Sequence, residues 1–468
     1  MEVSQSPAPI DVLGALWRSA GLPADALERV RLEGSEPVLP SSFAVGTAAQ
    51  VATAAAALAA TEVGRLRGGV VQTVGVDMRH AALECCGYFL IDGRRPELWD
   101  KLAGLYRCGS GWLRLHTNFA HHRDGVLRLL GLPEGAGTPR HAVAEALQDR
   151  DPQAFEDAAA GAGLVVAMLR SFQAWDAHPQ RAALAAVPLV SIRRIGEAPP
   201  LALPARSPAD RPLAGLRVLD LTRILAGPVG GRTLAAYGAD VMLVNGPHLP
   251  NIEAIADTSR GKRSALADLR TLDGRAGLRT VLADAHVLLQ GYRPGALAGL
   301  GFDVDDVAAI RPGIVMVSLS AYGGVGPWGA RRGFDSLVQA ATGYNLAEAE
   351  AAGSAEPKAL PMQILDMASG LLMAWGAQAA LLRQQRAGGS WHVEVSLART
   401  AQWLRALGRV AGGFETAARP DFAPWLETVA SGYGPLTAMR HAAQFSHTPA
   451  GWTRPSVPPG TDALRWST

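Results

Sequence analysis

From residue 213 onward, short apolar runs alternate with longer segments of helical character. The predicted strands are residues 216–221, 240–244, 285–289 and 314–319, and the predicted helices are residues 230–237, 270–283 and 304–310. Strands that alternate with helices pair in parallel through right-handed crossovers. We therefore predict an α/β fold, with a doubly wound, Rossmann-like parallel sheet domain plus a smaller α+β domain. Ligands of such sheets bind beyond the carboxyl ends of the strands.

A proline-rich stretch divides the chain. Residues 198–212 contain five prolines, which excludes a helix or a central strand and indicates an exposed linker. We predict five segments, which are an N-terminal helical segment, a small domain, the linker, the Rossmann-like catalytic domain and an irregular C-terminal tail, at residues 1–84, 85–200, 201–212, 213–411 and 412–468.

Charge and cysteine content exclude several classes of protein. Lys and Arg number 44 against 42 Asp and Glu, so we expect neither nucleic acid nor an anionic membrane as a partner. The three cysteines, Cys85, Cys86 and Cys108, form no CxxC pair, which disfavours a disulfide framework and a cysteine-rich zinc site. Residues 1–4 lack signal-peptide features, and the alanine-rich stretch 43–60 indicates a buried helix. We expect a soluble, cytoplasmic protein.

One unit of the sequence occurs twice. An apolar helix that ends in basic residues is followed by Gly68-Gly69 and by the strand-like run Val74-Gly75-Val76. The same order of helix, basic residues, glycine pair and V-x-V run recurs around residues 381–395. We interpret the two units as an internal duplication, with a chance resemblance as the alternative.

Two features near the predicted sheet suit an anionic ligand. The loop at residues 221–232 joins a strand to a helix and carries three glycines, so its backbone N–H groups can approach an anion, although an ordinary turn fits equally. Lys262 and Arg263 stand at the entrance to a strand, where they can hold phosphates or form a solvated patch.

Two aspartates open apolar helices. Asp366 is the one charged residue of stretch 359–382. It can cap its helix, or it can act as a nucleophile that the helix dipole keeps ionised. Asp335, beside Arg331 and Arg332, leaves the same two interpretations open.

Three histidines invite a metal interpretation. His116, His121 and His122 do not have the spacing of a helical metal site, so we predict no metal.

Residues 213–405 resemble the first half of a class III CoA-transferase, the family of formyl-CoA and crotonobetainyl-CoA transferases, to which the α-methylacyl-CoA racemases are related. The matching runs are residues 215–228, 237–241, 260–264, 291–297, 300–302, 311–315, 320–323, 326–327, 333–335 and 388–397. Residues 45–200 resemble the second half of such an enzyme, on runs 74–77, 112–116 and 163–180. The two halves therefore stand in permuted order.

The resemblance implies the chemistry. Family transferases have their nucleophilic aspartate where Asp366 stands and an acidic neighbour where Asp335 stands, while racemases have a catalytic His at the position of Phe334. An enzyme that moves CoA between acyl-CoA thioesters and free carboxylates through an aspartyl-CoA intermediate on Asp366 is therefore implied. The alternatives are an acyl-CoA isomerase or racemase and a catalytically silent CoA-binding subunit.

The resemblance also implies the ligands and the assembly. Coenzyme A enters as the substrate acyl-CoA together with a small carboxylic acid, no cofactor is bound permanently, and the implied assembly is a homodimer. Leu225 replaces a polar residue of formyl-CoA transferases, which disfavours formyl-CoA and oxalate. The residues expected to bind CoA are Ile224, Leu225, Ala226, Tyr292, Ala296, Arg332, Lys262 and Arg263.

Overall fold

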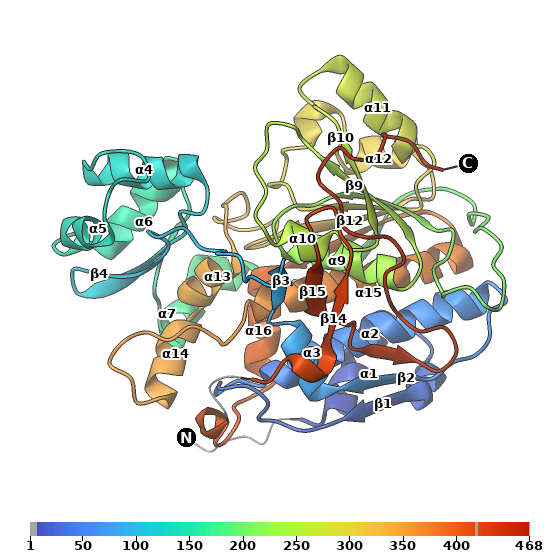
Figure 1. Ribbon diagram of the computed structural model, residues 1–468, viewed down its shortest axis with the longest axis horizontal. Coiled ribbons are helices and arrows are strands. Elements are labelled where there is room, and N and C mark those ends of the chain that lie inside the picture. The colour runs from blue at the N-terminus through green and yellow to red at the C-terminus, as the bar shows by residue number, and fades with distance from the viewer. Residues whose placement is uncertain (1–6, 417–419, 468) are drawn as a thin grey trace.

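The computed structural model describes residues 7–416 and 420–467, so the first residues, on which the absence of a signal peptide was argued, lie outside it. A seven-stranded sheet in the order β10-β9-β8-β11-β12-β13-β7 forms the centre of the molecule (Figure 1). Its strands are β7 (Val190–Gly196), β8 (Arg217–Leu221), β9 (Asp240–Asn245), β10 (Lys262–Leu266), β11 (Val287–Gln290), β12 (Val315–Ser320) and β13 (Ser390–Ser396). Strands β8 to β13 pair in parallel, which confirms the doubly wound α/β prediction.

Helices cover both faces of this sheet. On one face, Val287 and Val315 pack into a core that includes the long helix α15 (Ile364–Ala387). On the other face, their neighbours Leu288 and Met316 pack into a core that includes α11 (Leu272–Leu282) and α12 (Val304–Ile310). Strands that are buried on both faces are apolar throughout, which is why unbroken apolar runs predicted them. The helices of the sheet domain are α9 (Ala226–Ala236), α10 (Ile255–Thr258), α11 (Leu272–Leu282), α12 (Val304–Ile310), α13 (Asp335–Thr342), α14 (Tyr344–Ala351), α15 (Ile364–Ala387) and α16 (Leu397–Ala406).

Strand β7 differs from its prediction. It belongs to the segment predicted as the small domain, but it pairs antiparallel with β13 and extends the large sheet. The sheet is therefore mixed, and the chain enters it before the proline-rich linker. The sequence pattern of β7 could not show this, because its partner β13 lies about 200 residues further along the chain.

A small domain stands beside the sheet domain (Figure 1). It has an antiparallel sheet of order β4-β5-β6, and the side chains of Leu113, Leu127 and Phe155 share a separate core. The backbone N–H of Arg170 donates to the carbonyl of Ala340 on α13 at 3.1 Å, which joins this domain to the helix that follows Phe334. Its elements are β4 (Gly104–Cys108), β5 (Gly111–Leu115), β6 (Val166–Met168), α4 (Ala120–Leu130), α5 (Arg140–Leu147), α6 (Pro152–Gly161), α7 (Phe172–Asp176) and α8 (Pro179–Ala183).

The N-terminal segment supplies a second long buried helix. Its elements are α1 (Pro9–Ser19), β1 (Val30–Glu33), α2 (Val45–Leu66), β2 (Val74–Asp77) and α3 (Met78–Glu84). Helix α2 packs along α15, and both helices are buried over nearly their whole length. Among the described residues, α15 is the one helix long and apolar enough to cross a membrane, and that stretch is wholly buried in the protein. An exposed apolar helix would need cover from a second chain, but α2 of the same chain covers α15. The homodimer therefore stays a prediction.

The C-terminal tail is more ordered than its weak periodicity predicts. It forms β14 (Leu426–Val429), β15 (Leu436–Met439) and β16 (Ala443–Phe445). Strand β15 pairs with β3 (Phe89–Ile91), and β16 pairs with β2. The partners come from the other end of the chain, so the local pattern did not show them.

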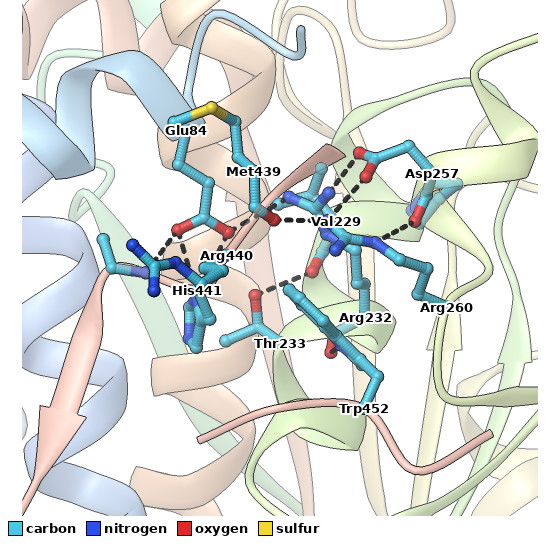
Figure 2. A network of polar contacts seen from close by, with 12 residues as sticks. Glu84, Val229, Arg232, Thr233, Asp257, Arg260, Met439, Arg440, His441 and Trp452 are labelled. Carbon is cyan, nitrogen blue, oxygen red and sulfur yellow. Dashed lines mark hydrogen bonds and ion pairs between the residues drawn. The ribbon is translucent and has the colours of Figure 1, made fainter. Parts of the chain in front are cut away.

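A network of buried charges joins the tail to α3, α9 and α10 (Figure 2). The Glu84 carboxylate lies 3.0 Å from His441 Nδ1 and 3.4 Å from Arg232 Nη2. Arg232 also pairs with Asp257, and Asp257 lies 2.6 Å from Arg260. Removing one partner of a buried ion pair costs about 3–5 kcal/mol, because the remaining charge stays buried. The network therefore ties α3, α9 and the tail together.

Candidate functional site

A cavity of about 410 Å³ opens at the carboxyl ends of β8, β11 and β12. Seven residues predicted for the site line it, namely Ile224, Leu225, Ala226, Tyr292, Ala296, Arg332 and Asp366. A second cavity of about 490 Å³ shares Tyr292, Arg293 and Ser320 with the first. The position at which a doubly wound sheet is expected to bind its ligand is thus a cavity, and a second cavity adjoins it.

A close helix crossing places Asp366 at this cavity. Asp366 lies in the first turn of α15, and Gly370 lies one turn further on. A Cβ on Gly370 would stand 2.3 Å from the carbonyl oxygen of Ala226, so only glycine lets α15 approach the start of α9 this closely. The approach brings the loop before α9 and the Asp366 carboxylate to the same hollow.

Asp335 binds the backbone of Asp366 from a position outside the cavity. Asp335 is fully buried in the first turn of α13 and does not line the cavity. Its carboxylate accepts the backbone N–H of Asp366 at 2.9 Å and a hydrogen bond from the Gln339 amide. It therefore fixes the start of α15 without facing a ligand.

Burial raises the proton affinity of both carboxyls, and the charge of Asp335 raises that of Asp366 further. Burial raises the pKa of Asp335 to about 7, although the hydrogen bonds it accepts act against the rise. Burial also raises the pKa of Asp366, and the neighbouring Asp335 charge raises it further. Two close carboxylates resist double ionisation. Because the hydrogen bonds favour charge on Asp335, the proton that the pair keeps near neutral pH resides on Asp366.

The loop before α9 carries backbone strain. Ile224 has φ 76°, in the left-handed region that β-branched residues avoid. Helix α9 follows directly and has no side-chain cap, so its first N–H groups are available to an anion or a polarised carbonyl in the cavity. Strain of this kind persists where surrounding structure holds it in place, commonly at ligand sites.

Lys262 and Arg263 are placed elsewhere. The Lys262 ammonium is fully buried, 2.8 Å from the Asp220 carboxylate and 2.8 Å from the Pro228 carbonyl oxygen. Arg263 pairs with Asp240 at 2.8 Å. Neither residue lines the cavity, because strand β10 directs Lys262 under α9. The sequence placed them correctly at a strand but could not show their carboxylate partners.

The sequence did not identify the residues that close the cavity from the small domain. Phe119, His121 and His122, at the start of α4, line it, although the histidines had been weighed only as metal ligands. His116 stacks on Phe334, with ring centroids 4.0 Å apart. Burial lowers the pKa of His116 to about 3 and that of His122 to about 3, so both rings are neutral at pH 7.

Comparison with known proteins finds a family model that matches the sheet domain. Residues 213–411 match the model of CoA-transferase family III. A probable fatty acyl-CoA transferase of Mycobacterium tuberculosis is 35% identical over 218 residues, covering 44% of this chain and 55% of that protein. A succinate–glutarate CoA-transferase of Agrobacterium fabrum is 32% identical over 215 residues, covering 42% and 52%. The chain thus spans about half the length of these two relatives.

One further match extends over both halves. An acyl-CoA transferase of Gibberella moniliformis is 28% identical over 444 residues, covering 85% of this chain and 78% of that protein. Among solved structures, a hypothetical protein of M. tuberculosis is 35% identical, covers 42% of this chain and 58% of its own, and has a TM-score of 0.39. A CaiB/BaiF family protein of Brucella suis is 28% identical, covers 48% and 65%, and has a TM-score of 0.38.

Proposed function

Because residues 213–411 match the model of CoA-transferase family III, we propose that this protein transfers CoA from an acyl-CoA thioester to a free carboxylic acid through a covalent intermediate on Asp366. The observation that carries the proposal is the position of the Asp366 carboxylate. It lies in a cavity at the carboxyl ends of parallel strands, at the positive end of a 24-residue helix. The helix dipole favours the anionic form that a carboxylate nucleophile needs, whereas burial and the Asp335 charge oppose it, so Asp366 attacks after it has released its proton.

The reaction is a series of acyl exchanges. The ionised Asp366 carboxylate attacks the thioester carbonyl, the C–S bond breaks, and CoA leaves as a thiolate from a mixed anhydride. The thiolate then attacks the Asp366 carbonyl, which gives an aspartyl-CoA thioester and releases the donor acid as its carboxylate. The acceptor carboxylate repeats the two steps in reverse and leaves as the new acyl-CoA, so Asp366 returns as a carboxylate. No oxidant or net proton is consumed.

The residues around Asp366 have separate tasks in this scheme. Asp335 is a positioning residue that holds the Asp366 backbone at 2.9 Å. The uncapped start of α9 offers N–H groups to the oxyanion that forms on the attacked carbonyl. Phe334 carries no group that can exchange a proton at the α-carbon, so racemisation has no base at that position.

The test is to trap the intermediate on its residue. The protein is incubated with a panel of acyl-CoA thioesters, treated with hydroxylamine or borohydride, digested and analysed by mass spectrometry. We expect the modification on the peptide that contains Asp366. We also expect Asp366→Asn to lower CoA exchange by at least about 1,000-fold while it still binds CoA esters. Exchange by this variant at a rate near that of the unmodified protein would refute the nucleophile.

We also propose a cytoplasmic location. Cys85, Cys86 and Cys108 are all free, which suits a reducing compartment. Fractionation of cells is the direct test, and recovery of the protein outside the cytoplasm would contradict the proposal.

A further inference from the structure

The loop that leads into α9 contains a strained residue at the edge of the catalytic cavity. Ile224 has φ 76°. Residues 224–226 line the same cavity as Asp366. A β-branched side chain in the left-handed region relaxes to a more favourable conformation unless surrounding contacts prevent it. The contacts at the two ends of this loop therefore determine where its backbone lies.

A buried carboxylate binds the start of the loop. Asp220, near the end of β8, is fully buried, and its Oδ1 accepts the backbone N–H of Thr222 at 2.9 Å and the hydroxyl of Thr222 at 2.5 Å. The other end of the loop packs closely on the same threonine, since a Cβ on Gly227 would stand 2.4 Å from Cβ of Thr222. The Asp220 carboxylate thus fixes the point at which the chain leaves the sheet.

The ammonium group of Lys262 connects that carboxylate to the other end of the loop. Strand β9 lies between β8 and β10, so the Lys262 side chain crosses β9 to reach Asp220 Oδ2 at 2.8 Å. The same Nζ donates to the carbonyl of Pro228, in the first turn of α9, at 2.8 Å. Gly231 leaves room for this pair, because a Cβ there would stand 2.2 Å from Asp220 Oδ2. One ion pair therefore fixes both ends of the loop around Ile224.

Stability alone does not account for a charged pair at this position. A buried ion pair adds little to stability, because the cost of taking two charges out of water offsets their attraction. Apolar side chains of similar volume would fill the space, but they could neither accept the Thr222 N–H nor donate to the Pro228 carbonyl. The contribution specific to Asp220 and Lys262 is the position of the loop.

We propose that Asp220 and Lys262 are positioning residues for CoA transfer, which keep Ile224 in its left-handed conformation and the first N–H groups of α9 directed at the cavity. The inference rests on the proposed function and adds two residues to it. Neither residue lines the cavity, so neither contacts a ligand there. The N–H groups of α9 meet an oxyanion in the transition state and not in bound CoA, so loss of the pair lowers kcat more than it weakens binding.

The test compares a variant that loses one charge with a variant that loses both. Lys262→Met leaves the Asp220 carboxylate buried without a counter-ion, so urea should unfold it more easily than the unmodified protein. Asp220→Asn/Lys262→Met buries no charge and keeps an amide oxygen for Thr222, so it should recover most of this stability. Its kcat for CoA exchange should stay about 100-fold low, whereas its Kd for free CoA should rise less than about 3-fold.

The matched control removes a largely buried ion pair that is unconnected to the loop. The Arg29 guanidinium lies 2.6 Å from the carboxylate of Glu62 on α2. We expect Arg29→Met/Glu62→Gln to keep kcat within about 2-fold of the unmodified protein, because distant sites act independently.

A glycine in the loop tests the strain itself. Glycine adopts the left-handed conformation without steric cost, so adding Ile224→Gly to Asp220→Asn/Lys262→Met should raise kcat. We expect a gain at least about 5-fold larger than the change that Ile224→Gly causes in the unmodified protein.

Three outcomes would overturn the inference. One is a kcat that recovers together with stability in Asp220→Asn/Lys262→Met, which would make the pair a structural element only. Another is a gain from Ile224→Gly that is no larger in this double variant than in the unmodified protein. The third is unchanged hydrogen exchange of the amides of residues 224–226 in the double variant, where we expect faster exchange.

The hydrogen-exchange measurement needs no substrate. An unmodified protein that exchanges no CoA would refute the proposed function, and the amides of residues 224–226 would still show whether the pair fixes the loop. Retained CoA binding shows that a variant is folded, and Asp220→Asn/Lys262→Leu provides a second double variant if the methionine variant is not.

Discussion

Helix α15 with β13 and α16, and helix α2 with β2 and α3, follow the same plan. In each unit a long buried helix leads through a glycine pair into a strand, and the last strand residue caps the next helix. In each unit a carboxylate from elsewhere in the chain binds the first turn of the long helix. Asp335 accepts the N–H of Asp366 at 2.9 Å, and Glu36 accepts the N–H of Thr47 at 2.7 Å.

The two units differ where the chemistry is expected. Gly46 stands as many residues before Gly68 as Asp366 stands before Gly388. A Cβ on Gly46 would stand 2.4 Å from Cγ2 of Val38, so that position is filled by neighbours, whereas Asp366 faces a cavity. The difference shows that the fold of the unit does not depend on the nucleophile. The site arises from the hollow that the sheet and the small domain form around one copy.

Adding a methyl group to one glycine of each long helix, Gly370 or Gly46, should give the largest difference in stability and activity between the two units. In Gly370→Ala the new Cβ meets the backbone oxygen of Ala226 at 2.3 Å, which cannot rotate away. We expect a loss of stability of about 3 kcal/mol, which outweighs the helix-propensity gain of about 1 kcal/mol. Displacement of the site should also lower kcat/KM by about 100-fold.

Gly46→Ala is the matched control, because its neighbour is the side chain of Val38 rather than the backbone. We expect a destabilisation of about 1–2 kcal/mol with kcat/KM nearly unchanged. Urea unfolding and CoA-exchange kinetics measure both variants. Equal activity losses in the two would mean that the α9–α15 crossing has no special role.

The carboxylates at the two helix starts allow a test by pH. Burial raises the pKa of Asp335 to about 7, so the folded protein holds a proton that the unfolded chain releases near pH 4. Because the folded state binds more protons, its stability falls as pH rises from about 4 to 7. CoA exchange should rise as the pH increases beyond neutral, because Asp366 then loses the proton that burial and the Asp335 charge hold on it.

Asp335→Asn removes the charge that raises the pKa of Asp366. We expect its pH–rate profile to shift to lower pH and its stability to vary less with pH. Burial also raises the pKa of Glu36, so Glu36→Gln should change the stability profile but leave the rate profile in place. A rate profile that does not move in Asp335→Asn would contradict the coupling.

Substitutions of the residues that cap α3 and α16 should have the smallest effects, and they test how closely the two units resemble each other. Asp77 accepts the N–H of His80 at 2.7 Å, and Ser396 accepts that of Arg399 at 3.4 Å. We expect Asp77→Ala to cost about 1–2 kcal/mol and Ser396→Ala about 0.5 kcal/mol, because the second bond is long. Thermal unfolding distinguishes them, and a larger loss for Ser396→Ala would reverse our ranking of the two caps.

The sequence predicted the features that depend on residues close together in the chain. The apolar runs at residues 216–221 and 314–319 became β8 and β12, because strands buried on both faces need apolar side chains throughout. Asp366 and the loop around Ile224 were found because a charge in an apolar stretch and a glycine-rich strand-to-helix loop are visible within a few residues. The resemblance to a known family assigned expected roles to these features.

Contacts between distant parts of the chain were beyond such patterns. Lys262 has its partner at Asp220, and His122 reaches Arg332 about 200 residues away. His441, in a tail predicted as irregular, meets the buried Glu84 near the other end of the chain. In each case the side chain is ordinary in its local sequence, and only the fold shows which group compensates its charge or polarity.

The packing of α2 on α15 also determines how the protein responds to dilution. An apolar helix covered by a second chain is exposed whenever the two chains separate, and the exposed fraction grows as concentration falls. Here the cover is part of the same polypeptide, so its local concentration is set by the connecting segments and not by the amount of protein. The helix that carries Asp366 is therefore shielded even in a solution of single molecules, and its shielding does not depend on assembly with another copy.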